Sequence, residues 1–180
     1  MDNQETNLIY GKNAVTETLN SGREIDTVYI QKGAALSKIV ALAKKNGVVI
    51  KEVSDERLTA ICGTPKHGGT AAELAAASYS TVEDILANAE QRGKPPFIII
   101  ADEIEDPHNL GAIIRTAEAA GADGLIIPKR RSASLNATVF KTSAGAAAWL
   151  KVARVANLVD TIKRLKEAGV WVYGMEADGT

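Results

Sequence analysis

The stretch from Phe97 to Pro128 constrains the fold most, because it predicts a complete strand, helix and strand unit. Residues 97–101 form a continuous apolar run between a proline and an acidic cluster, which is typical of a strand buried on both faces. Apolar residues then recur at helical spacing between Asn109, a favoured N-cap, and Gly121, which suits a left-handed C-terminal position. Residues 124–127 form the second strand. Two strands joined through a helix are expected to run parallel, so ligands should gather at their carboxyl ends.

The loop between the first strand and the helix is acidic rather than rich in glycine. It carries three carboxylates between residues 103 and 106, which argues against a plain phosphate cradle at the helix start. Within the helix, Arg115 lies two residues from both Ile113 and Ala117, about 200° away at ~100° per residue. We therefore predict that Arg115 points away from the buried face and is free to reach a ligand.

The motif Asn109-x-Gly111-x-x-x-Arg115-Thr116-Ala117 resembles the first signature of the SpoU (TrmH-like) family of RNA ribose 2′-O-methyltransferases. The resemblance extends to the strand before the motif and to Gly121-Ala122 after it. It implies methyl transfer from S-adenosylmethionine to a ribose 2′-hydroxyl of ribosomal or transfer RNA, by proteins that are usually homodimers. The alternative for the motif alone is an ordinary capped helix with a solvated arginine.

The first part of the chain predicts a compact α/β module. Strands are expected at residues 26–30 and 48–53, with a helix over residues 36–45 between them. Ile9-Tyr10-Gly11 and the loop at His67-Gly68 resemble the small N-terminal substrate-binding domain of many SpoU-family enzymes, although the family commonly has His-Gln-Gly at the second site. His67 could stack on an RNA base or contact a phosphate, but a solvated turn residue is the alternative that we favour.

Three cations, Lys129, Arg130 and Arg131, follow the second strand of the central unit. In a parallel sheet this loop lies at the same edge as Asn109, so the cations could hold an RNA backbone. A solvated turn is the alternative. Lys141 opens a stretch with Ser and Gly-Ala that resembles the segment after the first motif of the family, and we include it among the RNA-binding candidates.

Local patterns predict the remaining elements. Ser80 with Glu83 fits a capping box for a helix in the connection between the two parts of the chain. Residues 149–155 and 170–173 are predicted strands, and Asn157 is expected to cap a helix between them. Strands and helices therefore alternate through the second half, which indicates a mostly parallel α/β sheet covered on both faces.

Composition excludes several classes of protein. The chain of 180 residues has a formal charge of −1, so any RNA site must be a local basic patch. One cysteine and two histidines, Cys62, His67 and His108, make no visible metal-ligand cluster, and we expect no metal. The sequence has no apolar run of ~20 residues and no signal-peptide pattern, so we expect a cytoplasmic protein without membrane contact.

These features lead to one set of expectations. The fold class is α/β, with an RNA substrate-binding domain at residues 1–79, a linker with a short helix at 80–96, and an incomplete SPOUT-type domain, knot-forming in the family, at 97–180. The resemblance places most cofactor-binding residues beyond Thr180, which leaves Met175 as the candidate here, and predicts that the chain as given is inactive. Arg115 and Asn109 are the catalytic candidates. The rival functions are a non-catalytic RNA-binding protein and a nucleotide-binding α/β enzyme.

Overall fold

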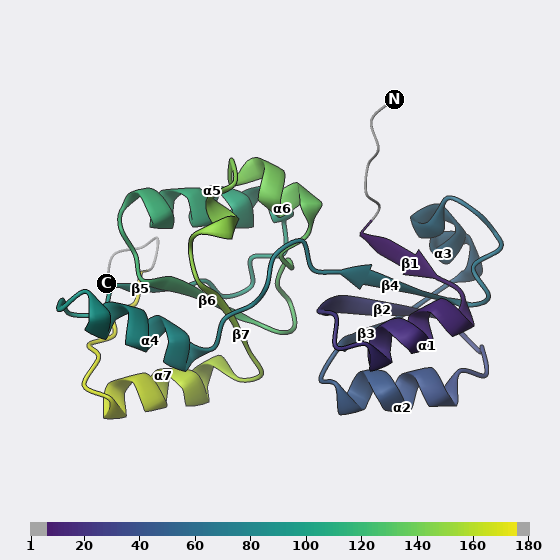
Figure 1. Cartoon of the computed structure of the whole chain (residues 1–180), viewed down its shortest axis with the longest axis horizontal. Coiled ribbons are helices and arrows are strands. Elements are labelled where there is room, and N and C mark those ends of the chain that lie inside the picture. Colours follow the sequence, from purple (N-terminus) through teal and green to yellow (C-terminus); the bar gives the residue numbers. More distant parts are fainter. Residues whose placement is uncertain (1–6, 176–180) are drawn as a thin grey trace.

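The computed structural model describes residues 7–175, which form two sheets with their own helices (Figure 1). We call the part with the first sheet the N-terminal unit and the part with the second sheet the C-terminal unit. The N-terminal unit contains β1 (Leu8–Tyr10), α1 (Lys12–Asn20), β2 (Ile25–Gln31), α2 (Ser37–Lys45), β3 (Val49–Val53), α3 (Asp55–Cys62) and β4 (Thr70–Leu74). The C-terminal unit contains α4 (Val82–Gln91), β5 (Ile98–Ile100), α5 (Pro107–Ala119), β6 (Gly124–Pro128), α6 (Ala137–Thr142), the 3₁₀ turn η1 (Ala146–Ala148), β7 (Val152–Val155) and α7 (Leu158–Glu167).

The N-terminal sheet is mixed, with strand order β1-β4-β2-β3. β2 and β3 run parallel, whereas β4 lies antiparallel to both β1 and β2. Figure 1 shows α1 and α2 on one face of this sheet, where Val15, Leu19 and Ile39 pack against Val28 in one apolar core. α3, which was not predicted, contacts β2 and β4 and buries Leu58 completely.

The C-terminal sheet is parallel, with strand order β5-β6-β7. This confirms the predicted parallel pairing of the strands on either side of α5. The side chains of β6 alternate between two cores, as the period of a strand requires. Leu125 and Ile127 pack with α5 and α6, whereas Ile126 packs with α4 and α7, and all three are fully buried. Helices therefore cover both faces of the sheet (Figure 1).

The start of α5 differs from the prediction. Asn109 is not the N-cap, because Asp106 takes that position and its Oδ1 accepts a hydrogen bond of 2.8 Å from the His108 N–H. Pro107 is the first helical residue, where its fixed φ suits the helix and its missing N–H costs nothing. The helix therefore begins before the signature motif, and Asn109 lies in its exposed first turn.

The cap of α4 also shifts by one residue. Thr81 and Asp84 form the capping box, not Ser80 and Glu83. Ser80 is already used by the sheet, because its N–H donates to the Val152 carbonyl at 2.8 Å. Pairing with a distant strand therefore decides between two adjacent cap sequences that are equally good locally.

The last predicted strands are shorter or absent in the described residues. Residues 149–151 of the strand predicted at 149–155 form a turn and a bend after η1, and β7 begins only at Val152. Residues 170–173 form no strand in the described part of the chain, and the side chains of Trp171 and Tyr173 are exposed. Alternating apolar residues form a strand only where a neighbouring strand can pair with them, and none pairs here among residues 7–175.

The predicted domain boundaries stay a prediction. α4, within the stretch expected to be a linker, packs on the C-terminal sheet, because Ile85 belongs to the same core as Ile126 and Leu165. Among the helices of residues 7–175, none has the length and apolar character needed to cross a bilayer.

Candidate nucleic-acid interface

A cleft of about 1010 Å³ lies between the two units. It is lined from the N-terminal side by β2, β3 and the end of α2, and from the C-terminal side by the loop after β6 and by β7. The charged lining residues are the cations Lys44, Lys51, Lys129, Arg130, Arg131 and Arg154, with the carboxylates Glu73 and Glu105. Cations thus prevail in this cleft although the whole chain is close to neutral.

One of the two carboxylates in the cleft is partly satisfied within the protein. The Tyr29 hydroxyl donates to Glu73 Oε2 at 2.9 Å. Burial first, and then the charge of Glu73, raises the pKa of Tyr29, so the hydroxyl remains a hydrogen-bond donor at neutral pH. This bond engages one carboxylate oxygen and leaves the cations to dominate the field of the cleft.

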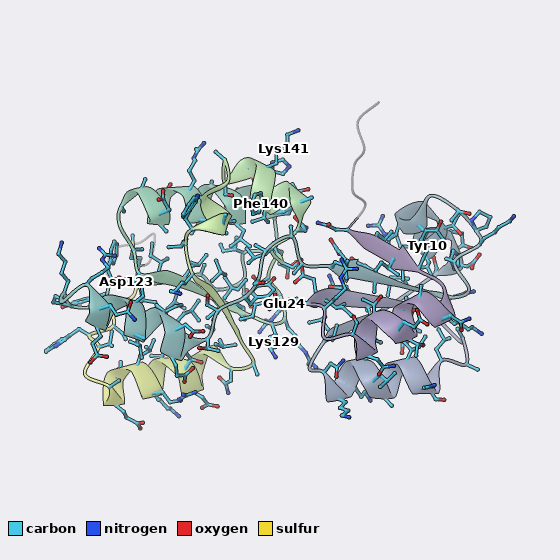
Figure 2. All side chains as sticks on the ribbon, in the orientation of Figure 1. Tyr10, Glu24, Asp123, Lys129, Phe140 and Lys141 are labelled. Atoms are coloured by element: carbon cyan, nitrogen blue, oxygen red, sulfur yellow. The ribbon has the colours of Figure 1, made fainter. Side chains whose placement is uncertain are left out.

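The three predicted cations form the loop after β6, and this loop reaches across to the N-terminal unit. The Lys129 N–H donates to the Val155 carbonyl at 2.8 Å, which fixes the loop to the end of β7. Lys129 Nζ lies 3.4 Å from the position that a Cβ at Gly47 would occupy. Figure 2 shows Lys129 between the two units.

Arg131 joins this loop to the acidic loop after β5. Its Nη1 lies 2.6 Å from Glu103 Oε1, and both residues have a positive φ that is unusual for a residue with a side chain. The Ala133 N–H also donates to the Ile104 carbonyl at 2.7 Å. Because the ion pair is solvent-exposed, it contributes only about 0 to 1 kcal/mol, and Arg131 can exchange Glu103 for a phosphate at small cost.

Arg115 lies on the exposed side of α5, as predicted, at helical spacing from the exposed residues His108 and Ala112. Asn109 is exposed as well. Neither Arg115 nor Asn109 is among the residues that line the cleft. The cation loop therefore lines the cleft, whereas the two catalytic candidates lie outside its lining, with Asn109 two residues beyond Pro107, which does line it.

His67 is not a solvated turn residue, because its side chain is almost completely buried. Its Nδ1 accepts a 3.1 Å hydrogen bond from the Gly69 N–H, and its Nε2 lies 3.1 Å from Thr59 Oγ1 on α3. Asp55 lies 3.6 Å from the same nitrogen. We therefore expect His67 to shape its loop rather than to contact RNA.

The last two predicted site residues lie apart from the cleft lining. Lys141 is exposed on α6, and Figure 2 shows it projecting outward, away from Lys129. Met175, the cofactor candidate, is 98% exposed and is the last described residue. Neither residue is among those that line the cleft, so the structure does not bring them together with the cation loop.

Sequence reasoning missed the contribution of the N-terminal unit to the cleft. Lys44 and Lys51 lie on α2 and β3 and face the loop after β6 only because the units fold against each other. It also missed Arg154, a cation within the apolar strand β7. A single charged residue in an otherwise apolar strand could have marked Arg154 as a candidate site residue, because buried charges are rare unless they are paired.

Two family models match the chain. The model described as RNA 2′-O ribose methyltransferase substrate binding matches residues 8–80, and the SpoU rRNA Methylase family matches residues 96–180. The two matches correspond to the two units of the structure. They do not support the rival interpretation as a nucleotide-binding enzyme such as a dehydrogenase.

Similar curated proteins carry related names. YacO of Bacillus subtilis, named as a member of the TrmH family of tRNA/rRNA methyltransferases, is 44% identical over 178 residues, which cover 97% of this chain and 71% of YacO. A protein of Staphylococcus saprophyticus with the same family name is 40% identical over 176 residues, covering 96% of this chain and 70% of the relative.

Solved structures of RNA methyltransferases are more distant. An rRNA methyltransferase from Sinorhizobium meliloti is 25% identical with a TM-score of 0.43. The match covers 91% of this chain and 60% of the solved chain. The SpoU methyltransferase AviRb from Streptomyces viridochromogenes, crystallised with the cofactor AdoMet, has 20% identity, a TM-score of 0.42 and coverage of 90% and 60%. The chain thus spans about 60% of the length of these solved proteins. On the family-model matches and the identity to YacO, the chain belongs to the SpoU (TrmH) family of tRNA/rRNA methyltransferases.

Proposed function

We propose that this protein binds ribosomal or transfer RNA in the cleft between its two units and takes part in methyl transfer to a ribose 2′-hydroxyl. The observation that carries the proposal is the prevalence of cations in the cleft of a chain with a formal charge of −1. Phosphate contacts dominate RNA affinity, so a local cluster of cations supplies the binding energy that the net charge does not. The methyl donor that we propose is S-adenosylmethionine, which some of the similar solved proteins contain.

The cleft offers contacts on two sides of a bound strand. Lys44 and Lys51 belong to the N-terminal unit, and Lys129 with Arg130 belongs to the C-terminal unit. Phosphate contacts of this kind position the RNA without reading its sequence. We therefore expect the cleft to set the path of the RNA backbone, while contacts elsewhere select the nucleotide.

Arg115 is the residue that we propose for the reacting ribose. A guanidinium stays protonated in proteins, so it cannot act as the base that takes the hydroxyl proton. It can orient the hydroxyl and stabilise the negative charge that develops on its oxygen. The exposed position of Arg115 supports access to a ligand. For Asn109, also exposed, we propose a contact with the ribose.

RNA titration of a triple variant tests the binding proposal. Replacing Lys129, Arg130 and Arg131 with Ala should weaken binding and reduce the slope of log affinity against log salt by about 0.7 for each lost contact to a single strand. A matched control removes three cations from α7 by replacing Lys163, Arg164 and Lys166 with Ala, which changes the net charge equally. Equal slopes for both variants would refute the cleft as the binding site.

Single-turnover methylation tests the role of Arg115, with the protein carried to the full length of its relatives. Arg115→Ala should lower the methylation rate strongly and RNA affinity only modestly, because the charge acts mainly in the transition state. If the rate stayed at the parental value while RNA binding persisted, the catalytic role of Arg115 would be excluded. The rival of a non-catalytic RNA-binding protein would be favoured instead if the full-length parent itself bound RNA and methylated none.

Two further properties belong to this proposal. We propose a cytoplasmic location, since transfer and ribosomal RNA are found there, and a homodimer, as the family resemblance implies. The large apolar residues Trp171, Tyr173 and Met175 are each more than 80% exposed, which supports self-association, because exposed apolar surface favours contact with another protein. Sedimentation at several protein concentrations tests the oligomeric state.

A further inference from the structure

A buried ion pair joins the two units at the cleft. Arg154 Nη1 on β7 lies 2.7 Å from Asp26 Oδ1 on β2, and the two side chains are 11% and 0% exposed. The partners are 128 residues apart in sequence. Arg154 also lines the cleft, and its Nη2 donates to the Lys129 carbonyl at 3.4 Å. The pair therefore connects the N-terminal sheet to the cation loop.

Tyr79, in the segment between the two units, completes this cluster. Its hydroxyl donates to Asp26 Oδ1 at 2.8 Å and accepts from the Leu135 N–H at 2.8 Å. The Arg154 guanidinium lies 4.9 Å from the centre of the tyrosine ring, within the range of a cation–π contact. The Tyr79 N–H donates to Glu24 Oε2 at 3.0 Å, which ties the same residue to the N-terminal unit a second time.

An irregularity in β2 accompanies Asp26. Ile25 pairs with Leu74 and Thr27 pairs with Glu73, so the register against β4 shifts between Ile25 and Thr27, and Asp26 is the extra residue. Such a bulge bends the strand and re-aims a side chain. Asp26 has no partner in the pairing of β2 with β4, and its side chain contacts Tyr79 and Arg154.

The Asp26–Arg154 ion pair is better suited to orienting the two units than to stabilising the fold. A buried ion pair gains little over an apolar pair of similar size, because both charges lose their hydration. Here Asp26 Oδ2 and Arg154 Nε have no hydrogen-bond partner among the described residues, which adds to that cost. The cluster instead restricts the angle between the two units. Tyr79 and Arg154 each donate a short hydrogen bond to Asp26, and the Arg154 guanidinium also stacks on the Tyr79 ring.

We propose that Asp26, Tyr79 and Arg154 are positioning residues that form an interdomain latch, which sets the width of the cleft and places the cation loop for RNA. This inference rests on the proposed function. With the latch intact, Lys44 and Lys51 on one side and the loop after β6 on the other meet the same RNA strand. Without it, the units sample several angles, and only a fraction of them presents both sides together.

Distance measurement between labelled cysteines tests the latch without RNA. The native Cys62 on α3 and a cysteine introduced by Lys163→Cys on α7 place one spin label in each unit. The test variants are Tyr79→Phe and the charge-free pair Asp26→Asn with Arg154→Met. We expect a narrow distance distribution in the parent and a broadened one in both variants. An unbroadened distribution in folded variants would overturn the latch.

The control pair is Glu83→Gln with Arg164→Met. It removes an ion pair of two exposed side chains that lies entirely within the C-terminal unit, with the same change of charge. We expect this control to leave the label distances and the RNA affinity at their parental values. Broadening in the control would also overturn the inference, because the effect would then not require contact between units.

RNA affinity of the same variants tests the consequence for the cleft. If loss of the latch reduces the competent arrangement to about a tenth of the molecules, the apparent Kd rises about tenfold. Broadened distances with unchanged affinity would refute the positioning role. If the parent bound no RNA, the proposed function would fail and the role in the cleft with it, whereas the label distances would still decide whether the latch exists.

Discussion

The glycine of the signature motif makes a stability prediction that the structure allows to be worked out. Gly111 lies where α5 packs against α6. A Cβ added at this position would lie 1.9 Å from Thr142 Oγ1, 2.8 Å from Thr142 Cβ and 3.0 Å from the Ser143 N. Gly111→Ala therefore forces the two helices apart, since real Cβ atoms do not approach other atoms so closely.

Two terms of opposite sign set the magnitude. Alanine is favoured over glycine within a helix by about 1 kcal/mol. Overpacking costs typically about 1 to 3 kcal/mol, and the upper end applies because two of the contacted atoms belong to or adjoin the backbone of α6. Thr142 Oγ1 is also held by its 2.8 Å bond to the Thr138 carbonyl. The net expected loss is roughly 2 kcal/mol, or about 4 to 8 °C in Tm.

Urea denaturation followed by circular dichroism measures this loss. Ala112→Gly, at the exposed neighbouring position, isolates the propensity term and should lose about 1 kcal/mol. Adding Thr142→Ala to Gly111→Ala should recover part of the stability, because it removes the 1.9 Å contact and leaves the contacts at 2.8 and 3.0 Å. If Gly111→Ala were as stable as the parent or more stable, the close approach of α5 and α6 would be refuted.

Three other changes have defined outcomes. Thr81→Ala removes the N-cap of α4 and should lower the free energy of unfolding by about 1 kcal/mol in urea titration. Asp123→Ala takes away the acceptor of the Phe97 N–H and should cost about 1 to 3 kcal/mol in thermal unfolding, whereas the exposed control Asp102→Ala should change stability by less than about 0.5 kcal/mol. Burial raises the pKa of Asp26, so its protonated form favours the folded state. The parent should therefore lose stability relative to Asp26→Asn as pH rises from below about 3.9 through the raised pKa, and a difference independent of pH in urea titrations would contradict this.

The central unit of the C-terminal sheet could be predicted because its signals are local. The apolar run before α5, the helical spacing within it and the run of β6 each depend on neighbouring residues, and the structure confirms both strands and their parallel pairing. The prediction that the first strand is buried on both faces was wrong for the described residues, because β5 lies at the end of the strand order and is only partly buried. The helix start was wrong because Pro107 was overlooked as a first helical residue. The predicted cap at Ser80 was wrong for another reason. The Ser80 N–H bonds to the Val152 carbonyl of β7, and the next residue, Thr81, caps α4 instead.

The candidate site was predictable only in part. Three adjacent cations after a strand are visible in the sequence. Because parallel strands end at the same edge of a sheet, the sequence also predicts that these cations lie at the carboxyl edge. Their partners Lys44 and Lys51 depend on how the two units pack, which local patterns do not encode. His67 was misjudged because its burial comes from α3, a helix that the sequence pattern did not reveal.

The strand order of the N-terminal sheet has a consequence for synthesis. β1 pairs with β4 and with no other strand of the described chain, although about 60 residues separate them. At about 5 to 20 residues per second, the ribosome completes β4 roughly 3 to 12 s after β1. During that interval β2 and β3 can pair with each other, but β1 has no neighbour. Insertion of β4 between β1 and β2 is therefore the event that completes this sheet, and a pause before Thr70 would prolong the time for which β1 is open to aggregation.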